Sequence, residues 1–316
     1  MKNKRKILVV CHDAGGAEII SAYIKRHSAD YNFVCIVAGP AEKIFKRKKL
    51  AKYIISTKKS PIRLLSQIKN LQMVLTGTGW ASSLELDFVK AARKKGIKTV
   101  SYLDHWTFYR ERFGYPRRTW KNNLPDEIWV GDKYAYKLAE RFFKKIIIKF
   151  IPNLYFKEIR DNYKRMRVTK KPRIAENILF VSEPISSRLN YLKDRNNISF
   201  TEFDILKEML NFFSREKLNR RIIIRYHPAE KIDKYDNFLS EYVGQLEIEK
   251  SNNQDVLQDI IRAKIVIGIN SMALVIAHLC GKKTISLLLN GKKNYSLPIE
   301  EIIRVKRIKD LKKEII

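Results

Sequence analysis

The sequence has 316 residues, which is long for one domain and suits two domains of about 150 residues each. Its 45% hydrophobic content is ordinary for a globular protein, and no apolar run approaches the roughly 20 residues that a membrane-spanning helix needs. The formal net charge of +31 indicates an anionic partner, and we expect an anionic membrane surface rather than nucleic acid, because no helix-turn-helix, RRM or KH signature accompanies the basic residues. A lysine-rich composition inherited from the genome would give the same charge.

The N-terminal segment does not predict export. It is basic over Met1–Lys6, but Ile7–Cys11 is too short for the apolar region of a signal peptide. Three widely spaced cysteines, Cys11, Cys35 and Cys280, lack any metal-type spacing and are expected to be reduced core residues. We therefore expect a cytoplasmic protein, peripheral on the inner face of the membrane if it binds lipid.

Short β-branched runs alternate with segments of helical period along the whole chain, a pattern typical of βα units with parallel sheets. In the first half, strands are predicted at Lys6–Cys11, Phe33–Val37, Met73–Thr76, Lys98–Leu103, Glu127–Val130 and Ile146–Phe150, with helices at Ala17–Lys25, Ser82–Lys95 and Lys133–Phe143. These elements predict a first Rossmann-like domain over residues 1–155, and if the protein transfers a group between two substrates, we expect this domain to bind the acceptor substrate.

The alternation of strands and helices is interrupted over residues 156–172, a polar and strongly basic segment that suits a connection between domains. A second series then follows, with strands at Asn177–Val181, Arg221–Tyr226, Lys264–Ile269 and Thr284–Leu288, and helices at Thr201–Ser214, Asp255–Ile261 and Met272–Leu279. We expect a second Rossmann-like domain, which binds the donor nucleotide, over residues 173–300, and a C-terminal helix or tail over 301–316. The fold class is therefore α/β, with two Rossmann-like domains facing a cleft.

The loop after the first strand carries His12, Asp13, Gly15 and Gly16. Glycines let the backbone approach a ligand closely, and Asp13 stands where a carboxylate could meet an acceptor hydroxyl. We interpret His12 and the two glycines as acceptor-binding and Asp13 as a candidate base. The alternative is that Asp13 only caps the following helix.

Two more loops of the first half carry candidate residues. Gly79 and Trp80 lie in a glycine-rich turn that either approaches the acceptor or is simply a tight connection. Asp104, His105 and Trp106 follow a predicted strand and combine a base, a proton-handling group and a ring suited to stacking on sugar. Asp104 is the first choice for general base, with a structural Asp–His pair as the alternative.

In the second half, candidates for binding the donor again follow strands. Pro228 biases His227 toward extended geometry, so that its ring can face a phosphate; a buried histidine is the alternative. Ser271 stands at a predicted helix start after Asn270, where a hydroxyl and free N–H groups suit an anion, although a pure cap would look identical. Weaker donor-binding candidates, Ser182 and Glu183, follow the first strand of this half.

No metal site is expected, because the five histidines lie far apart and no Asp-x-Asp stands where a metal-dependent transferase would need it. The residues instead suit a reaction without cofactor, with a nucleotide sugar as co-substrate. A carboxylate would deprotonate the acceptor, while His227 and helix N-termini stabilise the departing phosphate.

The His227-Pro228 pair and the later Ser271 at a helix start resemble the HP and Ser motifs of bacterial GT-B sialyltransferases, polysialyltransferases and capsule Kdo transferases. They also resemble those of the teichoic-acid polymerases, which use CDP-glycerol or CDP-ribitol. The resemblance implies that His227 and Ser271 bind the phosphate of a cytidine nucleotide, and that Asp13 or Asp104 matches the acidic base of the N-terminal domain. The sequence departs from these families in its His-Asp-Ala-Gly first loop and in Met272 after the serine.

The favoured function is a metal-independent glycosyltransferase that moves a CMP-linked keto-acid sugar to a surface glycan or lipid-linked acceptor. A CDP-polyol phosphate transferase and a UDP-sugar transferase are alternatives within enzymes. A basic module that binds nucleic acid or membrane is the alternative outside them.

Overall fold

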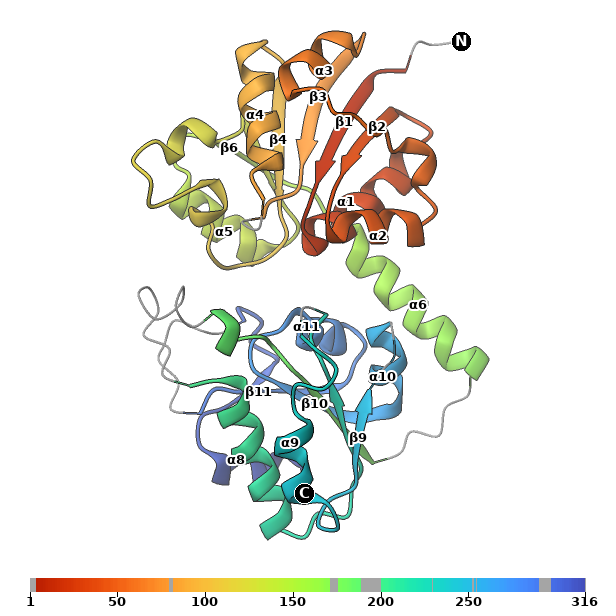
Figure 1. Ribbon diagram of the computed structural model, residues 1–316, viewed down its shortest axis with the longest axis vertical. Helices are drawn as coiled ribbons and strands as arrows, with labels where there is room; N and C mark the ends of the chain where they lie inside the picture. The colour runs from red at the N-terminus through yellow and green to blue at the C-terminus, as the bar shows by residue number, and fades with distance from the viewer. Residues whose placement is uncertain are drawn as a thin grey trace. The chain divides into compact units, whose positions relative to one another are not determined.

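The computed structural model describes residues 4–79, 82–170, 176–188, 200–228, 230–251, 253, 255–289 and 297–315. It divides into two compact units, Met1–Glu158 and Ile159–Ile316, each built on a parallel sheet (Figure 1). The boundary between the units falls within helix α6 (Leu154–Lys170), which occupies most of the segment predicted as a connection. Two parallel sheets with interleaved helices confirm the predicted α/β class with two Rossmann-like domains.

The sheet of the first unit has the order β2-β1-β3-β4-β5-β6. Its strands are β1 (Lys6–Cys11), β2 (Asn32–Val37), β3 (Leu71–Thr76), β4 (Lys98–Leu103), β5 (Glu127–Val130) and β6 (Ile147–Phe150). Its helices are α1 (Ala14–His27), α2 (Pro40–Arg47), α3 (Pro61–Gln67), α4 (Leu84–Lys94) and α5 (Lys133–Phe142), with 3₁₀ turns η1 (Ala51–Tyr53), η2 (Glu111–Phe113) and η3 (Trp120–Asn123).

Helices cover both faces of this sheet, because alternate residues of its strands are apolar on both sides. Ile7 and Val9 of β1 pack into a cluster with residues of α1 and α2. Leu8 and Val10 pack into a second cluster with residues of α3 and α4. Figure 1 shows α3 and α4 on one side of the sheet and α1 and α2 on the other.

The sheet of the second unit has the order β12-β11-β10-β7-β8-β9. Its strands are β7 (Asn177–Val181), β8 (Ile222–Arg225), β9 (Ile248–Ser251), β10 (Ala263–Gly268), β11 (Lys283–Leu287) and β12 (Ile303–Val305). Its helices are α8 (Glu202–Arg215), α9 (Asp236–Leu239), α10 (Val256–Arg262), α11 (Met272–Leu279) and α12 (Lys312–Ile315), with 3₁₀ turns η4 (Ser186–Arg188), η5 (Ser240–Tyr242) and η6 (Ile308–Leu311).

The strands that the sequence predicts are all present, with ends that shift by at most two residues. Strands β9 and β12 were not predicted, and β12 comes from the segment expected to be a C-terminal helix or tail, where it pairs with β11. Both are short edge strands that carry charged residues, so their sequences lack the apolar run of a buried strand.

Each sheet reverses its strand order at one point. In the first unit the chain leaves β1 for β2 and then crosses to β3 on the other side of β1; in the second it crosses from β9 to β10 on the other side of β7. In open parallel sheets, ligands bind outside the carboxyl ends of the strands at such a switch point. Each unit therefore has a candidate site of its own, at β1/β3 in the first and at β7/β10 in the second. None of the helices in the described ranges is long and apolar enough to cross a bilayer.

Candidate functional site

At the switch point of the first unit, Asp13 pairs with its neighbour His12. The His12 Nδ1 atom lies 2.8 Å from Asp13 Oδ1, and the two side chains are 20% and 24% exposed. Asp13 stands at the N-cap position of α1, but its carboxylate accepts no capping hydrogen bond. The capping alternative is therefore wrong, and the carboxylate is directed to the histidine instead.

A buried acid that the sequence reasoning missed supports this pair. Glu85, in the first turn of α4, accepts a 2.7 Å hydrogen bond from the backbone N–H of His12. Burial raises the pKa of Glu85, and the nearby Asp13 charge adds to the increase. Its only sequence signal is an acidic residue in the first turn of a helix, which is the ordinary pattern of helix stabilisation.

Asp104, the first choice for the base, is held in an ion pair. Its Oδ1 accepts a 2.5 Å hydrogen bond from Nη1 of Arg112, which also donates to the carbonyl and hydroxyl oxygens of Thr78 at 2.9 and 3.0 Å. The other oxygen lies against α1, where a Cβ added to Gly15 would meet Asp104 Oδ2 at 1.8 Å. Asp104 therefore joins the loops after β1, β3 and β4, and both its oxygens face the protein's own atoms.

The glycines of these loops allow close packing of one loop on another. A Cβ on Gly16 would lie 2.9 Å from Cα of Gly77, and one on Gly79 would lie 2.2 Å from Asp13 Oδ2. Gly39, at φ +55°, would place a Cβ 2.7 Å from Nε2 of His12. The space beside Gly15, Gly16 and Gly79 is thus taken by the chain itself, while their contact with an acceptor stays a prediction.

His105 and Trp106 lie beside this core of the site. The Nδ1 atom of His105 accepts the backbone N–H of Trp106 at 2.9 Å, which leaves the ring proton of the neutral form on Nε2. Burial and the charge of Arg112 lower the pKa of His105 to about 4. The indole of Trp106 is largely buried and its N–H donates to Asp132, the cap of α5, so the ring is packed into the fold. Trp80 lies outside the described residues.

At the switch point of the second unit, Ser271 is the N-cap of α11. Its hydroxyl accepts the backbone N–H of Ala273 at 3.2 Å, as predicted for a cap. The preceding Asn270 is buried, its backbone N–H donates to Glu183 Oε2 at 3.1 Å, and its Oδ1 has no hydrogen-bond partner in the described part of the chain. Glu183 thereby joins the ends of β7 and β10. The Leu274 N–H is bonded to the Ser271 carbonyl, so what the N-terminus of α11 offers an anion is the positive end of the helix dipole.

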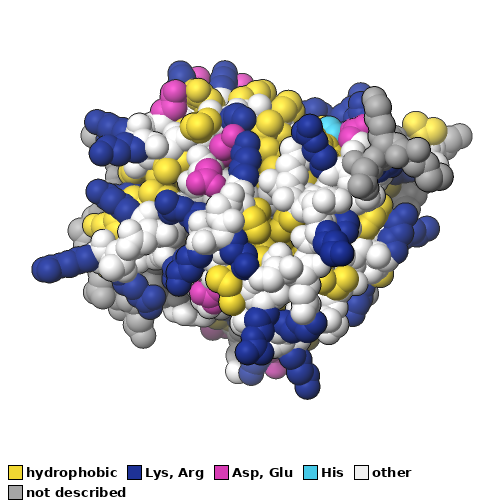
Figure 2. Space-filling model, turned by 90° about the horizontal axis from the view of Figure 1, so that it is seen from above, with side chains coloured by type: hydrophobic (Ala, Val, Ile, Leu, Met, Phe, Trp, Pro, Cys, Tyr) yellow, Lys and Arg dark blue, Asp and Glu magenta, His cyan; other side chains and the backbone are white. Residues whose placement is uncertain are grey.

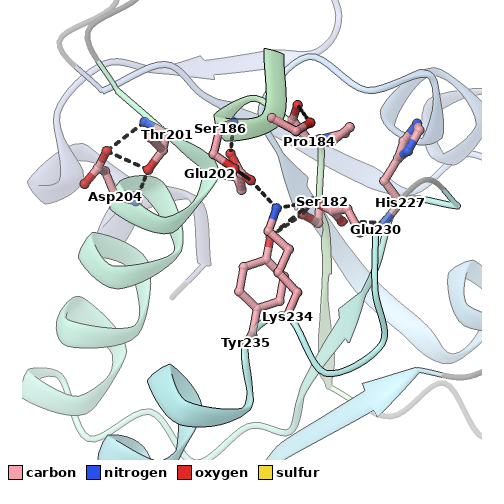
Figure 3. Close-up of polar contacts among 11 residues, drawn as sticks. Ser182, Pro184, Ser186, Thr201, Glu202, Asp204, His227, Glu230, Lys234 and Tyr235 are labelled. Carbon is pink, nitrogen blue, oxygen red and sulfur yellow. Dashed lines mark hydrogen bonds and ion pairs between the residues drawn. The ribbon is translucent and has the colours of Figure 1, made fainter. Parts of the chain in front are cut away.

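His227 and Pro228 follow β8, next to β7 in the same sheet. The backbone N–H of His227 donates to Glu230 Oε2 at 2.7 Å. Figure 3 shows the imidazole ring directed away from Lys234 and Tyr235. Ser182 is buried and its hydroxyl bonds Glu230 at 3.0 Å and the Tyr235 hydroxyl at 2.5 Å, so it serves the packing around this turn.

No group of three or more histidine, cysteine, aspartate or glutamate side chains that could hold a metal ion occurs among the residues described. At the switch point of the first unit, Asp13 is paired with His12, Asp104 with Arg112, and Glu85 with the backbone N–H of His12. The first unit therefore presents a partly exposed carboxylate, and the second unit presents the start of a helix, as candidate functional groups.

Comparison with solved structures shows that other proteins share this fold. The UDP-GlcNAc 2-epimerase of Methanocaldococcus jannaschii, solved in complex with UDP-GlcNAc and UDP, is similar with a TM-score of 0.66 and 12% identity, covering 98% of this chain and 91% of the epimerase. MurG of Acinetobacter baumannii is similar with a TM-score of 0.51 and 11% identity, covering 93% and 79%.

A UDP-glucosyltransferase of Polygonum tinctorium is similar with a TM-score of 0.52 and 9% identity, covering 90% of this chain and 80% of that one. No protein-family model and no curated protein sequence matches the chain. At these identities the likeness concerns the fold alone. The chain has the GT-B fold, with two Rossmann-like domains.

Proposed function

We propose that this protein is a glycosyltransferase that moves a sugar from a nucleotide-sugar donor to a glycan or lipid-linked acceptor without a metal ion. The observation that carries the proposal is the His12–Asp13 pair at the switch point of the first unit, which presents a partly exposed carboxylate on a GT-B fold. The similar structures support it, because two of them are described as a UDP-GlcNAc 2-epimerase and a UDP-glucosyltransferase. MurG is similar in fold.

Asp13 is the proposed general base, in preference to Asp104. A base needs a carboxylate oxygen within reach of the acceptor hydroxyl. Asp104 is 14% exposed and bound by Arg112, whereas Asp13 is 24% exposed, with Oδ1 paired with His12 and Oδ2 beside Gly79 without a hydrogen bond among the described residues. His12 then orients the carboxylate, and the neutral His105 could donate its Nε2–H to an acceptor oxygen.

The second unit is the proposed donor site. The positive end of the α11 dipole, the Ser271 hydroxyl and the His227 ring would stabilise the phosphate that leaves with the nucleotide. A CMP-linked keto-acid sugar is the proposed donor, on the resemblance of His227-Pro228 and Ser271 to the cytidine-nucleotide motifs.

The test is a panel of CMP, CDP, UDP and GDP and their sugars, read by thermal shift and by nucleotide release. A ligand that binds the folded state raises its melting temperature with occupancy. Stabilisation by one nucleotide, and release of that nucleotide from its sugar in an Asp13-dependent manner, are expected. If no nucleotide stabilises the protein, the transferase proposal is wrong; release of CMP from CDP-glycerol alone would replace it by polyol-phosphate transfer.

Sugar epimerisation is the second candidate function. The observation that favours it is the higher structural similarity to the 2-epimerase, with a TM-score of 0.66 against 0.51 and 0.52 for the other two structures. Inversion at C2 requires the proton at that carbon to exchange with solvent. Incubation with UDP-GlcNAc in D₂O distinguishes the two functions. Deuterium at C2 would support epimerisation, whereas sugar transfer without deuterium at C2 would support the transferase.

An anionic membrane on the cytoplasmic side is the proposed location of the acceptor. Lysine and arginine number 64 against 33 aspartate and glutamate, and Figure 2 shows basic side chains spread over one whole face with few acidic ones. A surface hollow on the first unit is lined by Lys90, Arg93 and Lys94 of α4. Sedimentation with phosphatidylglycerol vesicles, lost in high salt and absent with phosphatidylcholine, is the expected result.

A further inference from the structure

Two hydrogen bonds join Glu230 to the backbone of His227, in the turn that follows β8. The Glu230 backbone N–H donates to the carbonyl of His227 at 2.8 Å, and the Glu230 carboxylate accepts the His227 N–H at 2.7 Å through Oε2. The pattern is that of a capping box, in which an acid reaches back to the N–H three residues before it. The backbone at His227 is therefore fixed by Glu230 from both directions.

The other oxygen of Glu230 fixes this turn to the next strand. Its Oε1 accepts the hydroxyl of Ser182, directly after β7, at 3.0 Å, and the ammonium of Lys234 at 2.6 Å. Figure 3 shows these side chains converging below His227. Glu230 thus joins the ends of two neighbouring strands at the edge where the donor phosphate is proposed to bind.

Lys234 balances two buried carboxylates. Its ammonium contacts both Glu230 and Glu202, whose side chains are almost or wholly inaccessible to water. Glu202 also accepts the backbone N–H and the hydroxyl of Ser186, the first residue of η4, at 2.7 and 2.5 Å. Burial would raise the pKa of Glu202, but the hydrogen bonds from Lys234 and Ser186 outweigh it and lower the pKa. Without Lys234, two buried acids would share a site with no cation between them, and an uncompensated buried charge is strongly unfavourable.

We infer that Glu230 and Lys234 are positioning residues for the donor site. They touch no reacting atom, and they hold the turn at His227 and Pro228 so that the imidazole of His227 contacts the phosphate. This inference rests on the proposed function, because it assigns His227 to the donor phosphate. In catalytic sites a misplacement of about 1 Å is enough to lower the reaction rate on the order of 100-fold, which shows how closely such groups must be positioned. A cluster that served stability alone would leave the affinity of the folded protein for nucleotide unchanged.

The experiment compares E230Q and K234M with wild type, using whichever of CMP, CDP, UDP or GDP stabilises the wild type most. Calorimetry below the melting temperature of each variant gives the Kd for folded protein. H227A shows what loss of the ring costs. E249Q is the matched control, since it removes a carboxylate paired with Arg262 near the amino ends of the strands in the same sheet. K234R keeps the charge and is expected to retain affinity.

Three results are expected together: a Kd raised about tenfold or more in E230Q and K234M, a rise in KM for the donor larger than the fall in kcat, and no change in E249Q. Unchanged affinity in E230Q and K234M, while H227A binds weakly, would overturn the inference and leave the proposed function standing. If the wild type bound no nucleotide, the proposed function would fall instead.

A second measurement does not depend on any nucleotide. The His227 amide is expected to exchange slowly with D₂O in wild type, because it donates to a buried carboxylate, and at least tenfold faster in E230Q. Neighbouring amides of β8, such as Ile224, serve as the reference. Equal exchange of the His227 amide in the two proteins would show that Glu230 does not hold the turn.

Discussion

Replacing Asp13 and Asp104 separately by asparagine separates a catalytic role from a structural one. The two carboxylates lie in loops that follow β1 and β4 of the same unit, and from the sequence Asp104 is the first choice for the base and Asp13 the other candidate. Their surroundings differ, because Asp104 is paired with a largely buried Arg112 and Asp13 with the more exposed His12. The two variants are therefore expected to lose different properties.

The stability cost follows from what each replacement leaves behind. Removing one partner of a fully buried ion pair costs about 3–5 kcal/mol. Arg112 is 9% exposed and keeps its bonds to Thr78, and the new amide oxygen still accepts a hydrogen bond, so we expect about 2–3 kcal/mol for D104N. The Asp13 pair is more solvated, and D13N is expected to cost no more than about 1 kcal/mol.

The expected loss of activity is larger for D13N than for D104N, opposite to the expected loss of stability. Loss of a general base lowers the rate by about 10²–10⁴-fold, and this is expected for D13N, with D104N retaining activity at a temperature where it is folded. Urea denaturation gives the free energy of unfolding, and release of nucleotide in the presence of acceptor gives kcat. If D104N unfolded at the wild-type urea midpoint and lost activity while D13N kept it, the reasoning from the Arg112 pair would be refuted.

Three more predictions concern single residues. The pKa of His105 is about 4 in the folded protein against about 6.5 in an unfolded chain, so the unfolded state takes up a proton first as pH falls. The free energy of unfolding should therefore decrease from pH 6.5 to 4, by up to about 3 kcal/mol, and a persistent decrease of the same size in H105Q, in urea titrations at several pH values, would contradict this. G15A places a methyl group on the Asp104 carboxylate and should destabilise by about 1–3 kcal/mol in the same denaturation assay; a neutral effect would mean that the carboxylate lies elsewhere. S271A removes the hydroxyl that caps Ala273 and should cost about 1 kcal/mol of stability. Its Kd for the preferred nucleotide should also rise, and an unchanged Kd in calorimetry would remove Ser271 from the donor site.

Much of the fold could be predicted because the core strands carry their own signal. After their first residue, the strands β1, β5 and β7 are continuous apolar runs, as in strands buried on both faces, and their predicted ends match the structure. Strands β9 and β12 carry no such run, and they become strands only through pairing with β8 and β11. Edge pairing of this kind depends on the neighbouring strand, which a local pattern does not contain.

The candidate site could be predicted in part for the same reason. His12, Asp13, Asp104 and Ser271 directly follow strands or begin helices, so the sequence by itself placed them at the carboxyl edges of two α/β domains.

What each of these residues does was decided only by the tertiary structure. Arg112, in a 3₁₀ turn, donates to Asp104, and Glu85 accepts from His12, 73 residues away. Lys234 contacts both Glu202, at the start of α8, and Glu230, in the turn after β8. Whether a carboxylate is a free base or half of an ion pair depends on charges and burial supplied by distant segments. Local sequence fixes backbone geometry, whereas the partners of a polar side chain are set by the packing of the whole unit.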